Sequence, residues 1–193
     1  MLRNSGAKNV SIIEPSCVHY YQPLWTLVGG GQMQIKDSFK AMKDVIPFGT
    51  KWVKQSVISI QPEINQVTLD DGSTIPYDYL VVAGGIHEDW DATPGLREGL
   101  EKGDSGVVSN YDPEGAEKTW STFQSLIRDI QTQCQTGYKD KVTKILFTHP
   151  STTVKCAGAS QKILWMLEDN LRDVGLQTRK MSSHFYHTQR FHV

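Results

Sequence analysis

Hydrophobic residues recur at helical spacing in two long stretches in the second half of the chain. Within residues 113–135 and again within 160–174 they stand three or four positions apart. One apolar face of this kind is typical of an amphipathic helix that packs on a core. The pattern therefore predicts two helices, the first with Ala116, Trp120, Phe123, Leu126, Ile127 and Ile130 on its core face, the second with Ile163, Leu164, Leu167 and Leu171.

Shorter apolar runs predict strands elsewhere. Residues 9–15, 79–85 and 144–150 are rich in β-branched or apolar side chains and end in proline or small residues, as buried strands do. Residues 51–78 alternate more regularly around an Asp-Gly turn signal at 70–73, which predicts a small antiparallel sheet. A mixture of strands and helices in this order predicts an α/β fold.

The end of the chain has a different pattern. Residues 181–193 show neither a strand nor a helix period, yet they contain half of the six histidines. The histidine spacing fits no standard set of metal ligands. We therefore expect 178–193 to be a divergent, disordered tail, and we expect no metal site.

Composition narrows the function classes. A formal net charge of -1 gives no basic excess for binding nucleic acid, and no run approaches the length of a membrane-spanning helix. We also find no secretory or targeting segment in the sequence. Three cysteines without CxxC spacing do not suggest a disulfide framework. A reducing compartment or a catalytic thiol fits better.

Cys156 is the candidate for such a thiol. It lies between a predicted strand and a predicted helix, among small residues and next to Lys155. The positive end of a helix and a neighbouring cation both favour the nucleophilic thiolate over the thiol. The alternative is a small buried cysteine that only packs.

Glu14 is a second candidate, because it ends the first predicted strand. Dinucleotide-binding folds place an acid that binds the ribose at such a strand tip, about 20 residues after a glycine-rich turn. Here that turn would fall before Met1. The alternative is an ordinary surface glutamate. The glycines at 29–31 do not form a GxGxxG motif, so we interpret them as a loop rather than a phosphate cradle.

Four blocks in order carry a resemblance to a known family: IIEP at 12–15, YQPLWTLVG at 21–29, YLVVAGG at 79–85 and VKCAGA at 154–159. Together they resemble the sulfide:quinone oxidoreductases of the eukaryotic, mitochondrial type, within the flavoprotein superfamily with two dinucleotide-binding domains. The resemblance covers about residues 7–176. A generic flavin disulfide reductase would share only the first and third blocks.

The resemblance implies a site for FAD and a redox cysteine. Cys156 matches one of two redox cysteines and would be the catalytic residue. Positions that match cofactor contacts are Glu14 (the ribose), Gln22 (the flavin), Val57 (the adenine end), and Ala83 and Gly84 (the strand tip beside the cofactor). A low-pKa thiolate beside a flavin can attack sulfur and relay an electron pair.

The implied reaction is oxidation of hydrogen sulfide to sulfane sulfur, with electrons passing through FAD to ubiquinone. A small sulfur acceptor would be the further partner, and the location would be the mitochondrial inner membrane. The family's glycine-rich turn, second cysteine and membrane-associating regions are not found in the sequence. We therefore expect a truncated fragment that is inactive alone.

The expected domains are an incomplete Rossmann-like FAD-binding domain at 1–140 with an inserted antiparallel sheet, and the start of a second dinucleotide-binding domain at 141–177. Two alternatives remain open. One is a non-catalytic relic that does not bind FAD tightly. The other is a different FAD-dependent oxidoreductase of the pyridine-nucleotide-disulfide type.

Overall fold

A computed structural model gives the structure of the chain. It describes residues 6, 9–136, 143–149, 156, 158–176 and 181–187. Contacts divide the chain into two compact units, which are treated one at a time below. Unit 1 comprises residues 1–20 and 39–87, and unit 2 comprises residues 21–38 and 88–193.

Unit 1 contains a parallel strand pair that ends at Glu14. Strand β1 (Ser11–Ile13) pairs with β4 (Lys51–Val53) in parallel register, so β4 is not part of the antiparallel sheet expected over 51–78. The pairing continues past β1, because the Glu14 N–H donates to the Val53 oxygen at 3.0 Å. The Trp52 indole N–H donates to the Glu14 carbonyl at 2.8 Å. Both bonds fix the backbone at Glu14.

An antiparallel pair follows in the same unit. Strands β2 (Val18–Tyr20) and β3 (Phe39–Ala41) face each other, with the rings of Tyr20 and Phe39 at 5.6 Å between centroids. Cross-strand aromatic pairs of this kind stabilise a short ladder. The short helix α2 (Met42–Val45) begins immediately after β3.

The predicted antiparallel sheet is confirmed over β5 (Val57–Gln61), β6 (Gln66–Leu69) and β7 (Thr74–Pro76). A 3-10 turn, η4 (Pro62–Ile64), joins the first two strands. The Asp-Gly signal makes the second connection, where Gly72 adopts a φ of +81°, a conformation that glycine takes without strain. Val67 and Leu69 on the central strand are 1% exposed, so they form the centre of this sheet.

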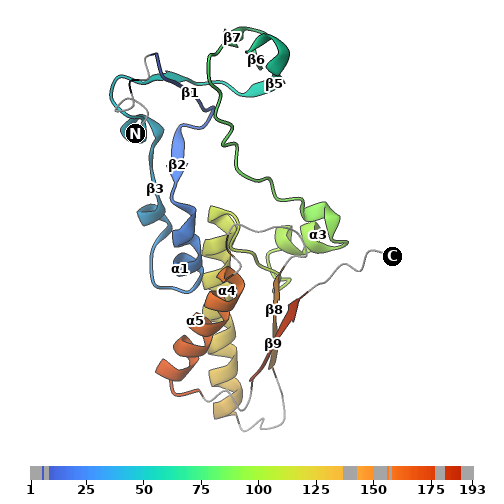
Figure 1. Cartoon of the computed structure of the whole chain (residues 1–193). Helices are drawn as coiled ribbons and strands as arrows, with labels where there is room; N and C mark the ends of the chain where they lie inside the picture. The colour runs from blue at the N-terminus through green and yellow to red at the C-terminus, as the bar shows by residue number, and fades with distance from the viewer. Residues whose placement is uncertain are drawn as a thin grey trace. The chain divides into compact units, whose positions relative to one another are not determined.

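The strand predicted over 79–85 is wrong. Residues 79–85 have no strand pairing, and Tyr79, Val81 and Val82 are 94%, 76% and 71% exposed. Figure 1 draws this stretch without a strand arrow. A buried parallel strand needs neighbouring strands and covered faces. Among the residues that the structure describes, this stretch pairs with neither of the strands β1 and β4, so its apolar sequence alone does not form a strand.

Unit 2 begins with short elements around the second sequence block. These are η2 (Gln22–Leu24), α1 (Trp25–Gly29) and η3 (Ile35–Ser38). Pro23 suits the first turn of η2, because a first-turn residue needs no N–H partner. After residue 88 come η5 (Trp90–Ala92) and α3 (Leu96–Glu101).

The two predicted long helices are confirmed as α4 (Pro113–Gln135) and α5 (Ala159–Asp173). The Asp112 carboxylate accepts from the Gly115 N–H at 2.6 Å and so caps α4, with Pro113 at the first helical position. Figure 1 shows α4 and α5 alongside each other, with β8 (Thr143–His149) close by.

One hydrophobic core joins these three elements. The rings of Phe123 on α4 and Phe147 on β8 meet edge to face at 6.5 Å. Each fully buried side chain of this size contributes about 1.5–3 kcal/mol. The buried members of the core are Phe123, Ile127, Ile130, Phe147, Ile163, Leu167 and Leu171. Since α4 and α5 share this core, residues on both sides of position 140 pack as one body, although the predicted domain boundaries themselves stay predictions.

The prediction that no strand forms after residue 180 is wrong for 181–187. Strand β9 (Met181–His187) pairs with β8 in parallel over seven residues, from Thr143 with Met181 to His149 with His187. Backbone pairing with an existing strand overrides the weak period of the sequence. Residues 188–193, also part of the predicted tail, lie outside the described residues.

Candidate functional site

Cys156 lies where the sequence predicts, in the connection between β8 and α5. Its thiol is exposed, so the alternative of a buried packing cysteine is wrong. The Ala159 N–H donates to the Cys156 carbonyl at 3.1 Å, which ties the cysteine backbone to the first residue of α5. A Cβ at Gly158 would lie 4.0 Å from the Cys156 sulfur, which is an ordinary van der Waals contact. Lys155 lies outside the described residues.

The three glycines at the end of α1 form a close-packed joint. A Cβ on Gly29 would lie 2.4 Å from Asn110 Oδ1, one on Gly30 2.5 Å from Met166 Cε, and one on Gly31 2.5 Å from the Trp120 ring. No real Cβ approaches other atoms this closely. The expectation that these glycines do not cradle a phosphate is therefore consistent with their geometry, because side chains fill the space in front of them.

A hydrogen bond connects this joint to the helix that follows Cys156. The Asn170 side-chain amide donates to the Gly30 carbonyl at 3.0 Å and to the Met166 carbonyl of its own helix at 2.7 Å. The glycine joint and helix α5, far apart in the chain, are thus brought into one packed body within unit 2.

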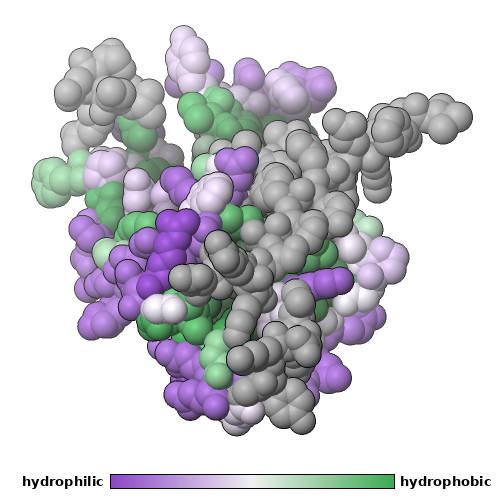
Figure 2. All heavy atoms as spheres, turned by 90° about the horizontal axis from the view of Figure 1, so that it is seen from below, coloured by the Kyte–Doolittle hydropathy of each residue, from purple (hydrophilic) through white to green (hydrophobic). Residues whose placement is uncertain are grey.

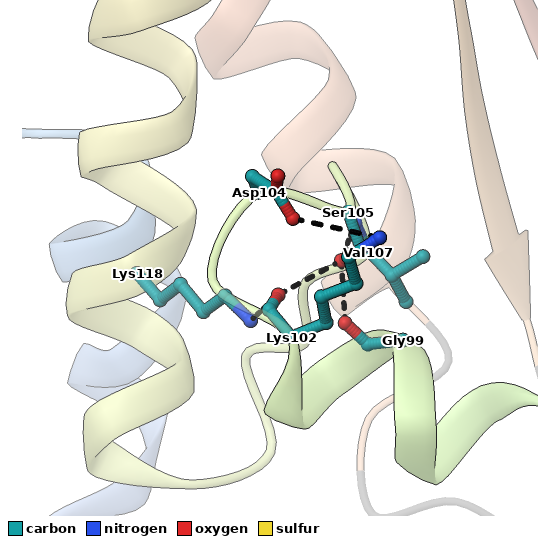
Figure 3. Close-up of polar contacts among 6 residues, drawn as sticks. All are labelled: Gly99, Lys102, Asp104, Ser105, Val107 and Lys118. Carbon is teal, nitrogen blue, oxygen red and sulfur yellow. Dashed lines mark hydrogen bonds and ion pairs between the residues drawn. The ribbon is translucent and has the colours of Figure 1, made fainter.

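The chain between α3 and α4 is held by a polar cluster (Figure 3). Lys118 on α4 extends its ammonium to the carbonyls of Leu100 and Lys102 at the end of α3, the second at 3.1 Å. Ser105 Oγ contacts the Gly99 and Lys102 carbonyls and accepts from the Val107 N–H at 3.0 Å. A cation on the last carbonyls of a helix satisfies groups that the helix itself leaves unbonded.

Next to this cluster, Asn110 and Tyr111 lead into α4. The Tyr111 N–H donates to Ser109 Oγ at 3.2 Å, and Asn110 packs against Gly29. Asn110 Oδ1 is buried without a hydrogen-bond partner among the described residues. Partial burial raises the pKa of the Tyr111 phenol, and the negative charges of Cys156 and Glu88 raise it further. Tyr111 and the candidate cysteine thus belong to the same unit.

The predicted cofactor contacts divide between the units. Gln22 is exposed at the start of η2 in unit 2, the unit that holds Cys156. Glu14, Val57, Ala83 and Gly84 all belong to unit 1. The residues predicted to contact the cofactor are therefore distributed over both units, four in unit 1 and one in unit 2.

In unit 1 the fit to a dinucleotide is partial. Glu14 follows β1, at the carboxyl end of a parallel pair, and its Oε1 accepts from the Ser16 N–H at 2.8 Å. Within the described part of the chain, Oε2 has no such bond and is free to accept from a ribose hydroxyl. Val57 on β5 is 40% exposed, and a Cβ on Gly84 would meet nothing within 4 Å, so both backbones are open to a ligand. No glycine cradle for a pyrophosphate accompanies them in the described ranges.

Two kinds of feature are absent from the described residues. No group of three or more histidine, cysteine or acidic side chains is placed to hold a metal ion. No helix in this part of the chain has the length and hydropathy needed to cross a bilayer. Hydrophobic side chains do reach the surface, as the green areas among purple ones in Figure 2 illustrate.

The fold is shared with several solved structures. The crystal structure of sulfide:quinone oxidoreductase from Aquifex aeolicus superposes with a TM-score of 0.72 at 21% identity, covering 96% of this chain and 38% of that one. A chain in the Tetrahymena thermophila mitochondrial ATP synthase structure gives 0.67 at 19% identity (96% and 43% covered), and NDH2 from Plasmodium falciparum gives 0.51 at 13% (92% and 36%). The predicted α/β class is confirmed.

Proteins related in sequence have a higher identity to this chain than the solved structures do. Mitochondrial sulfide:quinone oxidoreductases from Dictyostelium discoideum and Mus musculus are 47% and 41% identical to this chain over 92% and 91% of its length. The enzyme from Schizosaccharomyces pombe is 34% identical over 84%. The predicted resemblance to these proteins is confirmed. The chain spans about 35% of the length of the first two relatives and 33% of the third. No protein-family profile matches the sequence.

The sequence interpretation missed the surroundings of Cys156. Glu88 and Tyr111 lie in stretches that carry no motif, and the electrostatic effect of Glu88 and Cys156 on the Tyr111 pKa depends on how the chain folds. The only sequence signal was the Asp-Pro pair at 112–113, which fixes the start of α4 and with it the position of Tyr111.

Proposed function

We propose that this chain carries the redox-cysteine segment of an FAD-dependent sulfide:quinone oxidoreductase. The observation that carries the proposal is the exposed thiol of Cys156 beside the start of α5, in a chain 47% identical to a protein of that name. Hydrogen sulfide would be oxidised by two electrons to sulfane sulfur held on Cys156 as a persulfide, with the two electrons passing to FAD and two protons released. The location we propose is the mitochondrial inner membrane, with ubiquinone and a small sulfur acceptor as partners and with peripheral membrane association.

The chain's own residues would act in two ways. Cys156 would be the nucleophile, because a thiolate is the reactive form and a helix N-terminus favours it. Glu14 Oε2 would accept from the ribose of FAD, while Val57, Ala83 and Gly84 would lie against the cofactor and Gln22 would contact the flavin. When bound, FAD supplies a two-electron acceptor.

The test is sulfide-dependent reduction of a soluble ubiquinone by a protein that contains this segment, with FAD present. Cys156→Ser should abolish turnover while bound FAD, read from its visible absorbance, is retained. Cys17→Ser is the matched control, because Cys17 is also exposed but lies in unit 1. Turnover that survives in Cys156→Ser would refute the assignment.

A second candidate is a non-catalytic chain that does not bind FAD tightly. The observation in its favour is that no pyrophosphate cradle accompanies Glu14 among the described residues, and on this ground we expect no turnover by the 193 residues alone. A flavin absorbance spectrum of the purified chain discriminates between the two candidates, since a stoichiometric yellow complex would refute the second. The other oxidoreductases of the pyridine-nucleotide-disulfide type are less favoured, because their resemblance does not extend to residues 154–159.

A further inference from the structure

Residues 79–86 form a segment without a structural partner in the described part of the chain. Tyr79 is 94% exposed, Val81 76% and Val82 71%. No residue of the segment makes a hydrogen bond, ion pair or ring contact with another described residue. Contiguous apolar side chains that stay in solvent commonly mark a place where another protein binds.

The backbone on either side of this segment is tied down, whereas the segment itself is not. The Tyr77 N–H donates to the Asn65 carbonyl at 2.9 Å just before it, and the Ala92 N–H donates to the Asp89 carbonyl at 3.3 Å in η5 after it. Within the segment, Gly85 has a φ of +75°, and a Cβ there would meet nothing within 4 Å. A partner can therefore straighten this backbone without breaking a hydrogen bond or displacing a packed group.

Exposure alone does not distinguish the segment from other sites. Phe48 is 96% exposed, but it lies in a turn in which the Thr50 N–H donates to the Pro47 carbonyl at 3.0 Å. Trp165 is 61% exposed, but it lies within helix α5. A partner that binds an extended peptide has to open the turn or the helix first. The 79–86 segment needs no such opening.

A cut within the 79–86 segment breaks no helix or strand that the structure describes. Strand β7 ends at Pro76, and the next element, η5, begins at Trp90. The fragment before the cut would keep the strands from β1 to β7, and the fragment after it would keep α3, α4, α5, β8 and β9. Each fragment would therefore retain its own hydrogen-bonded elements.

Unit 2 nevertheless needs both fragments, because it is assembled from both sides of the segment. Its residues 21–38 come before the cut and its residues 88–193 after it. The glycine joint connects the two parts: Met166 lies in front of Gly30, and the Asn170 amide donates to the Gly30 carbonyl at 3.0 Å. These contacts do not depend on the peptide bonds of the segment, so they would hold the fragments together after a cut.

We propose that the 79–86 segment is a proteolytic modification site for an endopeptidase that recognises large apolar side chains, and that the cut chain stays together as a two-fragment complex. The peptide bond after Tyr79 or Leu80 is hydrolysed: the C–N bond breaks, and water supplies a hydroxyl to the carbonyl carbon and a proton to the nitrogen. Because the proposed function places Ala83 and Gly84 against FAD, the site belongs to the chain without the cofactor.

The experiment is limited digestion of the 193-residue chain with chymotrypsin, whose specificity pocket is a hydrophobic slot, with each cut identified by mass spectrometry. Cuts after Tyr79 or Leu80 should form about tenfold faster than the cut after Phe48, where a hydrogen-bonded turn has to open first. Tyr79→Ser combined with Leu80→Ser should slow cutting within the segment about tenfold and leave the Phe48 cut unchanged. A first cut after Phe48, or undiminished cutting of the segment in the double variant, would overturn the proposal.

The association of the fragments is tested on the cut chain. The two fragments should elute together from a gel-filtration column in buffer and separately in urea, because the glycine joint connects them. Asn170→Ala should lower the urea concentration at which they separate, and Gln161→Ala, at an exposed position of the same helix, should leave it unchanged. Fragments that separate without urea, or equal urea midpoints in the two variants, would show that the joint does not hold the cut chain. The readouts need neither FAD nor sulfide, so they are independent of the turnover assay.

Discussion

The side-chain amide of Asn170 donates a hydrogen bond to the carbonyl oxygen of Gly30 at 3.0 Å, although the two residues are 140 positions apart in the chain. It links the glycine-rich end of α1 to the helix that begins just after Cys156. The bond therefore contributes to the packing of α1 and α5 within unit 2.

Replacing Asn170 with alanine should lower the free energy of unfolding by about 1–2 kcal/mol. The Gly30 carbonyl would lose its long-range donor, and leaving a partly buried polar group unpaired costs about this much. Urea unfolding followed by far-UV circular dichroism measures the change. Gln161→Ala, at an exposed position of the same helix, should change stability by less than about 0.5 kcal/mol. Equal losses in the two variants would contradict a specific role for the Asn170 bond.

Gly31→Ala tests the glycine joint. Gly31 has a φ of +77°, and its missing Cβ would lie 2.5 Å from the Trp120 ring. The substitution combines left-handed backbone strain of about 1 kcal/mol with overpacking of about 1–3 kcal/mol. The same urea titration should therefore show a loss of about 2–4 kcal/mol.

The matched control is Gly175→Ala, in the same unit. Gly175 has a φ of +74° but nothing within 4 Å of the site of its Cβ. Gly175→Ala should lose only the part of the unfolding free energy that comes from backbone strain, about 1 kcal/mol. The difference between the two variants isolates the contact with Trp120, and the absence of any difference would mean that the ring moves aside without cost.

Lys118→Met tests how the segment after α3 is held. Methionine keeps the aliphatic stem but removes the donors to the carbonyls of Leu100 and Lys102. The amides of the last turn of α3 and of Val107 should exchange with deuterium about tenfold faster, which corresponds to about 1.4 kcal/mol of local stabilisation. Lys162→Met, an exposed lysine on α5, should leave these amides unchanged. Unaltered exchange in Lys118→Met would show that Ser105 alone holds the turn.

Tyr111 should make unit 2 sensitive to alkaline pH. Its pKa in the folded chain is raised, chiefly by burial, above the value of about 10 that it has when unfolded. The folded state then retains a proton that the unfolded state has lost, so its stabilising contribution is complete below about pH 10 and is lost as the pH rises through the folded pKa. Unfolding free energies at pH 8 and pH 11 measure the effect.

The variant Tyr111→Phe, which removes the hydroxyl, tests this prediction. Tyr111→Phe should lose less stability between these two pH values than the wild-type chain, because no proton is then released on unfolding from this position. Tyr77→Phe should retain the wild-type pH dependence of unit 2. An identical loss of unfolding free energy between pH 8 and pH 11 in all three chains would indicate that another group governs the alkaline sensitivity.

Local sequence determined much of this protein. The period of the apolar residues predicted the two long helices to within one residue at their ends, since an amphipathic face acts over a few neighbouring positions, and α4 also has the Asp112 cap. The Asp-Gly turn and the alternating strands fixed the small sheet for the same reason. The four sequence blocks together were enough to predict the resemblance to the relatives.

Tertiary structure decided the rest, because pairing and packing depend on partners that are distant in sequence. An apolar run at 79–85 stays unpaired and exposed, while residues 181–187, with no strand period, pair with β8. The glycines at 29–31 form a close-packed joint because Asn110, Met166 and Trp120 pack against them in the folded chain. The raised pKa of Tyr111 is decided in the same way, since it depends on burial in the folded chain and on charges distant in sequence.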